Sequence, residues 1–180
     1  MMKKAIIIIF IFLVAFALWR WLTGANSYLR MQDNEENTEL AFISEQIMGL
    51  EFLDLDGNKV RLSDFNDRPL VINSWAVWSP FSEGELKDFK SLQVEQGDKI
   101  YVIVINRGEE LRRQMRVIDL IGREDLIFLQ DGEDKFYTAL GGVGMPNTIF
   151  IDEDGKIIEY KDSAIILNEM REIISKIWAD

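Results

Sequence analysis

The apolar run PLVINSWAV, residues 69–77, constrains the fold most strongly. It has the length of one strand and almost no polar side chains, which is typical of a strand buried on both faces of a sheet. A second run of this kind, KIYVIVIN, occupies residues 99–106. Between the two, residues 80–94 have helical spacing of the apolar side chains Phe81, Leu86, Phe89 and Leu92. The sequence therefore predicts two buried strands joined by a helix.

The same alternation continues to the C-terminus. Strands are expected at 126–130, 147–152 and 156–160, and helices at 109–121, 134–140 and 165–178. In the helix at 109–121 the apolar contacts are expected from Leu111, Met115, Ile118 and Leu120. Upstream, GLEFLDLDGNKVRL reads as a hairpin around a turn at residues 54–58, and Ser63-Asp64-Phe65 as a helical turn. Residues 41–180 are thus predicted to form an α/β sandwich with a mixed central sheet covered on both faces.

The N-terminus has the pattern of a membrane anchor. Lys3 and Lys4 precede fifteen consecutive apolar residues, AIIIIFIFLVAFALW. A helix over residues 5–22 has a length of roughly 27 Å, close to the thickness of a bilayer core. Trp19 and Trp21 flank Arg20, as expected for an interfacial belt. Residues 1–22 are therefore predicted to span a membrane once, with a cytoplasmic N-terminus and an extracytoplasmic domain, periplasmic or cell-surface.

Two other interpretations of this segment stay open. Thr23-Gly24-Ala25 offers the small residues of a signal-peptide cleavage site, and a buried core helix is the third possibility. The stretch that follows, residues 23–40, is polar and is expected to be a linker.

Composition excludes several kinds of chemistry. The chain has no His and no Cys, so it lacks a Ser-His-Asp triad, a disulfide framework and thiolate-bound metal. Residues 31–180 hold 16 basic and 31 acidic residues, a balance of −15. Such a surface repels polyanions, so no nucleic-acid partner is expected. Three acidic segments, Asp54/Asp56, Asp131/Asp134 and Asp152/Asp154, are expected to be turns. They have no calcium-loop pattern, and neither a metal nor a cofactor is predicted.

Residues 74–85, SWAVWSPFSEGE, follow the first buried strand and carry the most specific pattern. They resemble the active-site segment of thioredoxin-fold proteins, W-A-x-W-C-x-x-C. Trp75, Ala76 and Trp78 match, and Ser79 and Ser82 occupy the two cysteine positions. The segment thus resembles a thioredoxin active site in which the two reactive sulfur atoms are replaced by hydroxyl oxygens.

Two further segments are similar to one family, the TlpA/ResA-type (redoxin) membrane-anchored thiol–disulfide oxidoreductases. LDLDGNKVRLSDFNDRPLVIN resembles its lead-in DxxGxxxxLSDFxGKPxxxN, and GVGMPNTIFIDEDGKI resembles its GxPxTFxIDxxGxI. The match covers roughly residues 48–178. It implies a thioredoxin-like α/β/α sandwich in which Pro146 follows a cis peptide bond and lies against the active site.

Serine cannot perform the reaction of this family. The family attacks a disulfide with one thiolate and resolves the mixed disulfide with the second. A hydroxyl pKa lies near that of water, about 15.7, and a helix N-terminus contributes at most ~2 kcal/mol, or about 1.5 pKa units. Ser79 therefore stays protonated, and no catalytic residue is expected in this chain.

The motif then has two competing interpretations. Ser79 as N-cap and Pro80 as first helical residue describe a simple helix start. Alternatively, the motif is a binding surface for a protein or peptide, formed by Trp75, Trp78, Pro80, Phe81, Met145 and Pro146. Trp75 is expected in the core and Trp78 at the surface. The function predicted first is a non-redox binding module. An oxidoreductase whose cysteines were replaced by Ser79 and Ser82, or a structural subunit of an envelope complex, are the alternatives.

Overall fold

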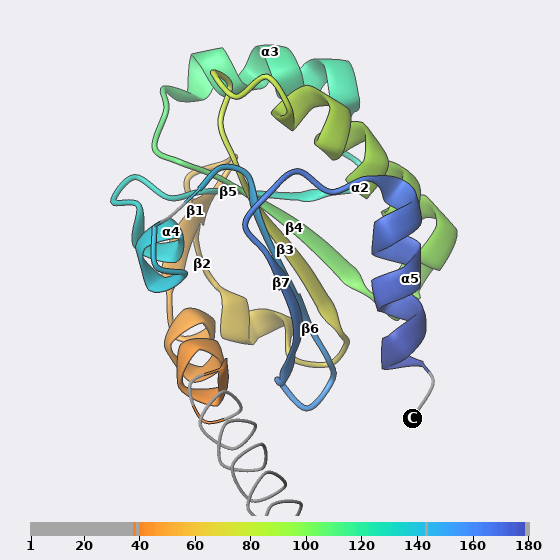
Figure 1. Cartoon of the computed structure of the whole chain (residues 1–180). Coiled ribbons are helices and arrows are strands. Elements are labelled where there is room, and N and C mark those ends of the chain that lie inside the picture. The colour runs from red at the N-terminus through yellow and green to blue at the C-terminus, as the bar shows by residue number, and fades with distance from the viewer. Residues whose placement is uncertain (1–37, 39, 143, 179–180) are drawn as a thin grey trace, which may run out of the picture. The chain divides into compact units, whose positions relative to one another are not determined.

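A seven-stranded mixed sheet is the centre of the part of the chain that the computed structural model describes, residues 38, 40–142 and 144–178 (Figure 1). The strand order is β2-β1-β5-β4-β3-β6-β7. The strands are β1 (Glu51–Asp54), β2 (Lys59–Arg61), β3 (Leu70–Trp75), β4 (Tyr101–Asn106), β5 (Ile127–Gln130), β6 (Asn147–Ile151) and β7 (Ile157–Lys161). All five predicted strand regions and the predicted hairpin are confirmed.

The two apolar runs lie in the middle of this sheet. β3 and β4 are parallel neighbours, with Leu70 opposite Tyr101 and Trp75 opposite Asn106. β5 extends the parallel part beyond β4, while β6 pairs antiparallel with β3 on the other side. Every residue of β3 is buried. Strands buried on both faces have no solvent side, which explains why the sequence of β3 does not alternate.

The helices cover both faces of the sheet. They are α2 (Ser82–Gln96), α3 (Leu111–Ile121), α4 (Lys135–Ala139), α5 (Leu167–Ile177), the short 3-10 helices η1 (Leu62–Phe65) and η2 (Gly97–Lys99), and a helix at 40–48. In Figure 1, α2, α3 and α5 lie on one side of the sheet, with α4 and the helix at 40–48 on the other.

Alternate residues of β3 serve two hydrophobic cores. Val71 and Trp75 pack with Phe89 of α2 and Ile174 of α5 in the first core. Ile72, on the opposite face, belongs to the second core with residues of α4 and of the helix at 40–48. This division follows from the two-residue period of a strand, which directs successive side chains to opposite faces. The predicted thioredoxin-like α/β/α sandwich is confirmed.

Two of the acidic segments expected to be turns have the same construction. Asp54 Oδ1 accepts hydrogen bonds from the backbone N–H of Asp56 (2.9 Å) and Asn58 (2.8 Å), and Gly57 has φ 83°. Asp152 Oδ1 accepts in the same way from Asp154 (3.1 Å) and Lys156 (2.8 Å). These carboxylates stabilise turns, so the interpretation of both segments as turns is confirmed.

Two expectations are corrected by the structure, and a third concerns residues that it does not describe. Residues 40–48 form a helix that was not predicted, and the chain divides into the units Met1–Glu39 and Leu40–Asp180. Leu120 is 61% exposed instead of buried, because two residues beyond Ile118 a helix has turned by about 200°. The predicted anchor at 1–22 lies outside the described residues. Within the described ranges, no helix is long and apolar enough to span a membrane.

Candidate functional site

The loop between β3 and α2 holds both serine positions, and both side chains are buried. Ser79 is 6% exposed and Ser82 is 2% exposed. The backbone N–H of Ser79 donates to Ala76 O (3.1 Å), and that of Ser82 donates to Ser79 O (3.3 Å). Ser82 Oγ accepts a hydrogen bond from the backbone N–H of Ala76 (3.3 Å). The Ser82 hydroxyl therefore helps to close the loop back onto the end of β3.

This geometry corrects the predicted helix start. The helix α2 begins at Ser82, with Phe81 at the N-cap position and no side-chain cap hydrogen bond. Ser79 is not the N-cap and Pro80 is not the first helical residue. The four residues 79–82 instead form a turn, closed by the bond from Ser82 N–H to Ser79 O.

The side chains around the turn divide into exposed and buried sets. Trp78 is 63% exposed and Phe81 is 53% exposed, and Pro80 between them is exposed as well. Trp75 is fully buried in the first core. The expected placement of the two tryptophans is therefore confirmed, and Trp78, Pro80 and Phe81 are the exposed side chains of this loop.

The start of β6 lies beside the end of β3. Ser74 is opposite Asn147 in the register, and the Ser74 hydroxyl donates to Met145 Sδ (3.7 Å). One residue earlier, Asn73 Nδ2 donates to Thr148 Oγ1 (3.0 Å). The Met145–Pro146 peptide bond is cis. Met145 is half-buried, whereas Pro146 is buried and presents no side-chain surface.

Glu109 holds the motif loop from the other side, and the sequence analysis did not single it out. Its Oε2 accepts from the backbone N–H of Val77 (2.6 Å) and from Asn106 Nδ2 (3.0 Å). The Glu109 N–H in turn donates to Asn106 Oδ1 (3.1 Å). A carboxylate oxygen accepts a hydrogen bond more strongly than a neutral oxygen does, so Glu109 fixes the loop at Val77. The role of Glu109 depends on a contact with a residue 32 positions away, which the sequence does not display.

Arg107 connects three of the loops at this edge of the sheet. Its backbone N–H donates to Trp75 O (3.2 Å), and its guanidinium makes a bidentate pair with Asp134 (2.8 and 2.5 Å). The guanidinium also stacks on Tyr137, 3.4 Å from the ring centroid, and the Tyr137 hydroxyl donates to Gly142 O (2.7 Å). Asp134 raises the pKa of Arg107 above its ordinary value, mainly through the hydrogen bonds. The network ties the loop before β6 to the end of β3.

Glu85 is a buried carboxyl in the first turn of α2. It is 4% exposed, and its Oε1 accepts from the backbone N–H of Ile165 (3.0 Å). Its Oε2 has no hydrogen-bond partner among the described residues. Burial raises the pKa of Glu85 to about 7, and the nearby Asp88 adds to the effect. The burial of Glu85 was not predicted from the sequence. The spacing from Ser82 to Leu86 and Phe89 was the available sign that it lies on the buried face.

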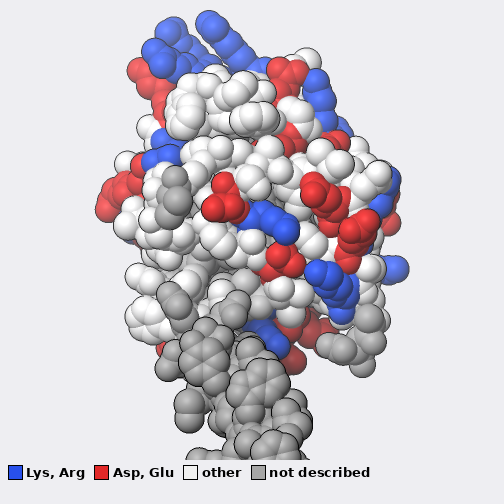
Figure 2. Space-filling model, viewed as in Figure 1, with Lys and Arg blue, Asp and Glu red and all other residues white. Residues whose placement is uncertain are grey.

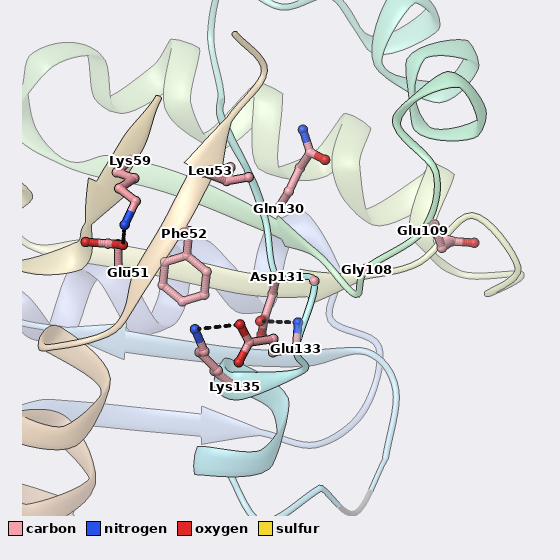
Figure 3. Close-up of a pocket in the computed structure, with 11 residues that line it drawn as sticks. Glu51, Phe52, Leu53, Lys59, Gly108, Glu109, Gln130, Asp131, Glu133 and Lys135 are labelled. Atoms are coloured by element: carbon pink, nitrogen blue, oxygen red, sulfur yellow. Dashed lines mark hydrogen bonds and ion pairs between the residues drawn. The ribbon is translucent and has the colours of Figure 1, made fainter. Parts of the chain in front are cut away.

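A pocket of about 380 Å³ lies near this edge but does not include the motif (Figure 3). Lys59 pairs with Glu51 (2.7 Å) and Lys135 with Glu133 (3.4 Å) across its wall. Glu109 borders the pocket, but in Figure 3 its carboxylate points away from the other residues. Both lysines of the lining are thus paired, and with Glu109 and Asp131 also present the four acids outnumber the two lysines. Within the described part of the chain, no cluster of His, Cys, Asp and Glu could hold a metal ion.

Fold and site together define a thioredoxin-like domain of the kind that exchanges disulfides, with serine at both positions where sulfur reacts. The comparison with family models agrees, because the Redoxin model matches residues 35–174. The chain belongs to the Redoxin family.

Its relatives are thiol–disulfide oxidoreductases. The chain is 27% identical over 182 residues to "Thiol-disulfide oxidoreductase ResA" of Oceanobacillus iheyensis, covering 97% of this chain and 87% of the relative. It is 31% identical over 160 residues to "Thiol:disulfide interchange protein DsbE" of Vibrio cholerae, covering 86% and 83%. A secreted Mycobacterium tuberculosis disulfide oxidoreductase has a similar fold, with TM-score 0.65, 14% identity and coverage of 72% and 96%.

Proposed function

We propose that this chain is a thioredoxin-like protein that binds a protein or peptide without exchanging disulfides. The observation that carries the proposal is the contrast within one loop. Both serines at the cysteine positions are buried, while Trp78 and Phe81 beside them are 63% and 53% exposed. The loop thus keeps an accessible aromatic surface without a reactive group.

The exposed aromatic pair has the chemistry of a binding surface. Large aromatic side chains are enriched among the residues that contribute most to protein–protein affinity. The loop that presents them is held by Glu109 and by Ser82, so little ordering remains to be done when a partner binds. Met145 at the start of β6 adds a half-buried apolar side chain near the end of β3. Together these residues favour an apolar or aromatic segment of a partner protein.

We expect a photo-crosslinking residue in place of Phe81 to capture a partner in intact membranes, and Trp78→Ala to weaken that capture roughly 30-fold. The magnitude corresponds to about 2 kcal/mol, the usual loss for a central aromatic contact. The yield of the crosslinked species, with and without Trp78→Ala, measures the effect. The complex is expected to survive reductant, because no sulfur links the two proteins.

Val94 provides the matched control. It lies on the same helix α2 and is 62% exposed, but it belongs to neither the motif loop nor the core. A crosslinker at position 94 should capture no partner, and Val94→Ala should leave the Phe81 crosslink unchanged. Equal capture from both positions would contradict a specific site at the motif.

We also propose that residues 5–22 anchor the chain in a membrane, with residues 41–180 on the extracytoplasmic side. The support is the uninterrupted apolar run after Lys3 and Lys4. In isolated membranes the chain is expected to keep its full mass of 20.9 kDa and to resist extraction by carbonate. A product that begins near Asn26 would establish cleavage of a signal peptide instead.

A second candidate function is disulfide exchange by a form of this protein with cysteine at positions 79 and 82. The oxidoreductase names of its relatives favour it. Sequencing the gene in the source organism decides between the two, because Cys codons at 79 and 82 would make the serine form a derivative.

A further inference from the structure

The helix α3 has one face in the core and one face covered with arginine. Gln114, Ile118 and Ile121 are buried, and the Gln114 side chain donates to Glu109 O (2.6 Å). This arrangement directs Arg112, Arg113 and Arg116 to the surface, where all three are exposed. Figure 2 shows blue side chains gathered at the top of the view, where α3 lies in Figure 1.

These arginines differ from the other arginines of the domain. Eight arginines lie in residues 40–142 and 144–178, and five of them are ion-paired: Arg61, Arg68, Arg107, Arg123 and Arg171. Arg112, Arg113 and Arg116 have no ion-pair partner among the described residues. Of the two acids at this helix, Asp119 is already paired with Arg123 (2.8 Å), and Glu110 at the N-cap forms no ion pair among the described residues. The cations of α3 are thus left for an external partner, although the chain is strongly acidic.

The position of these charges is unfavourable for the fold itself. Arg112 and Arg113 lie in the first turn of α3, where the positive end of the helix dipole repels cations. Arg112 and Arg116 are four residues apart, so they also repel each other across one helical turn. The first turn of α3 holds no acidic residue, and Glu110 at the N-cap makes no ion pair with these arginines. The arginines therefore do not serve the stability of α3.

Leu120 completes the surface. It is 61% exposed and lies one helical turn beyond Arg116. We define the α3 face as Arg112, Arg113, Arg116 and Leu120. It combines three unpaired cations with one apolar side chain on a single rigid helix.

We propose that the α3 face is a docking surface for an acidic segment of another protein, whose carboxylates pair with the arginines and whose apolar side chain covers Leu120. Guanidinium and carboxylate groups form bidentate pairs, which gives such a contact both strength and orientation. An extended membrane or a nucleic acid is a poorer match, because either would also approach the surrounding surface of this acidic domain. A narrow acidic segment can bind along α3 without contacting the surrounding acidic surface. The inference goes beyond the binding proposed at the motif loop and does not depend on it.

The test measures binding of a fluorescein-labelled synthetic peptide of Glu-Glu-Leu repeats to the full-length, detergent-solubilised chain at about 0.15 M salt. We expect saturable binding that weakens as salt increases. Arg112→Ala with Arg116→Ala should weaken it about tenfold or more, since each removes a charge-assisted contact. Leu120→Ser should weaken it a few-fold. The arginine change should not lower the midpoint of thermal unfolding, because the arginines oppose the helix dipole.

The matched control is Lys99→Ala with Lys156→Ala, which removes the same number of charges. Both lysines lack an ion-pair partner among the described residues, and neither is on α3. Equal weakening by the lysine and arginine pairs would overturn the proposal, because only net charge would then matter. Failure of the wild-type chain to bind the peptide would overturn it too. So would arginine-dependent binding to phosphatidylglycerol vesicles without peptide binding, or a lowered unfolding midpoint in the arginine variant.

Discussion

Replacing Ser79 and Ser82 together by Cys is expected to create catalytic disulfide reduction in a chain that has none with serine. The free thiol pKa of about 8.5 lies roughly seven units below that of a hydroxyl, so the ionised fraction at neutral pH rises by about seven orders of magnitude. The turn closed by Ser82 N–H and Ser79 O (3.3 Å) brings the two Cα atoms within about 7 Å, compatible with a disulfide. Turnover of insulin by the purified variant measures the gain.

The two single replacements are the matched controls for this experiment. Ser79→Cys alone can form a mixed disulfide but has no second thiol to resolve it, and Ser82→Cys alone leaves the first position without a nucleophile. Both should lack turnover. Insulin reduction by the serine chain itself would contradict the acidity argument. An inactive double-cysteine variant would show instead that the surrounding site no longer supports the reaction.

The free energy of unfolding is expected to fall by about 2 kcal/mol between roughly pH 5.5 and 8 because of Glu85. Its pKa is about 7 in the folded chain, above the ordinary value of 4.5. In this window the unfolded chain has released the proton, while the folded chain still binds it. The stabilisation is complete below pH 4.5 and is lost as pH rises through 7. Chemical denaturation at several pH values measures it.

The composition makes this measurement unusually clear. The chain has no His and no Cys, so no other side chain with an ordinary pKa titrates between pH 5.5 and 8. Glu85→Gln should make the stability independent of pH in this window and raise it at pH 8. Glu83→Gln, which removes an exposed carboxylate from the same helix, should keep the pH dependence. A stability that is constant or rises with pH in the wild-type chain would show that Glu85 is ionised in the fold.

The local pattern of the sequence was sufficient for the strands, for the helices that follow β3, and for their order. β3 and β4 are continuous apolar runs, and such runs specify buried strands wherever they occur in a chain. The acidic turns at Asp54 and Asp152 depend on hydrogen bonds within five residues, which a sequence displays directly. The helix at 40–48 was not predicted because its apolar residues adjoin a polar stretch. Their burial depends on packing against the second core.

The candidate site depended on contacts between distant residues. Glu109 reaches Val77 across 32 positions, Arg107 reaches Asp134 across 27, and Glu85 reaches Ile165 across 80. None of these partners is implied by spacing, since each contact joins segments that only the tertiary structure brings together.

The mixed α/β fold and the absence of thiol chemistry follow from the sequence alone, because strand and helix periodicity and the ionisation of a hydroxyl are local properties. The family follows from the resemblance of three sequence motifs and from the Redoxin match at residues 35–174. Burial is not local. Whether Ser79 and Glu85 face water, and whether the arginines of α3 find acids to pair with, was decided only when the chain packed. Desolvation and ion pairing depend on which surfaces the tertiary structure leaves in contact with solvent.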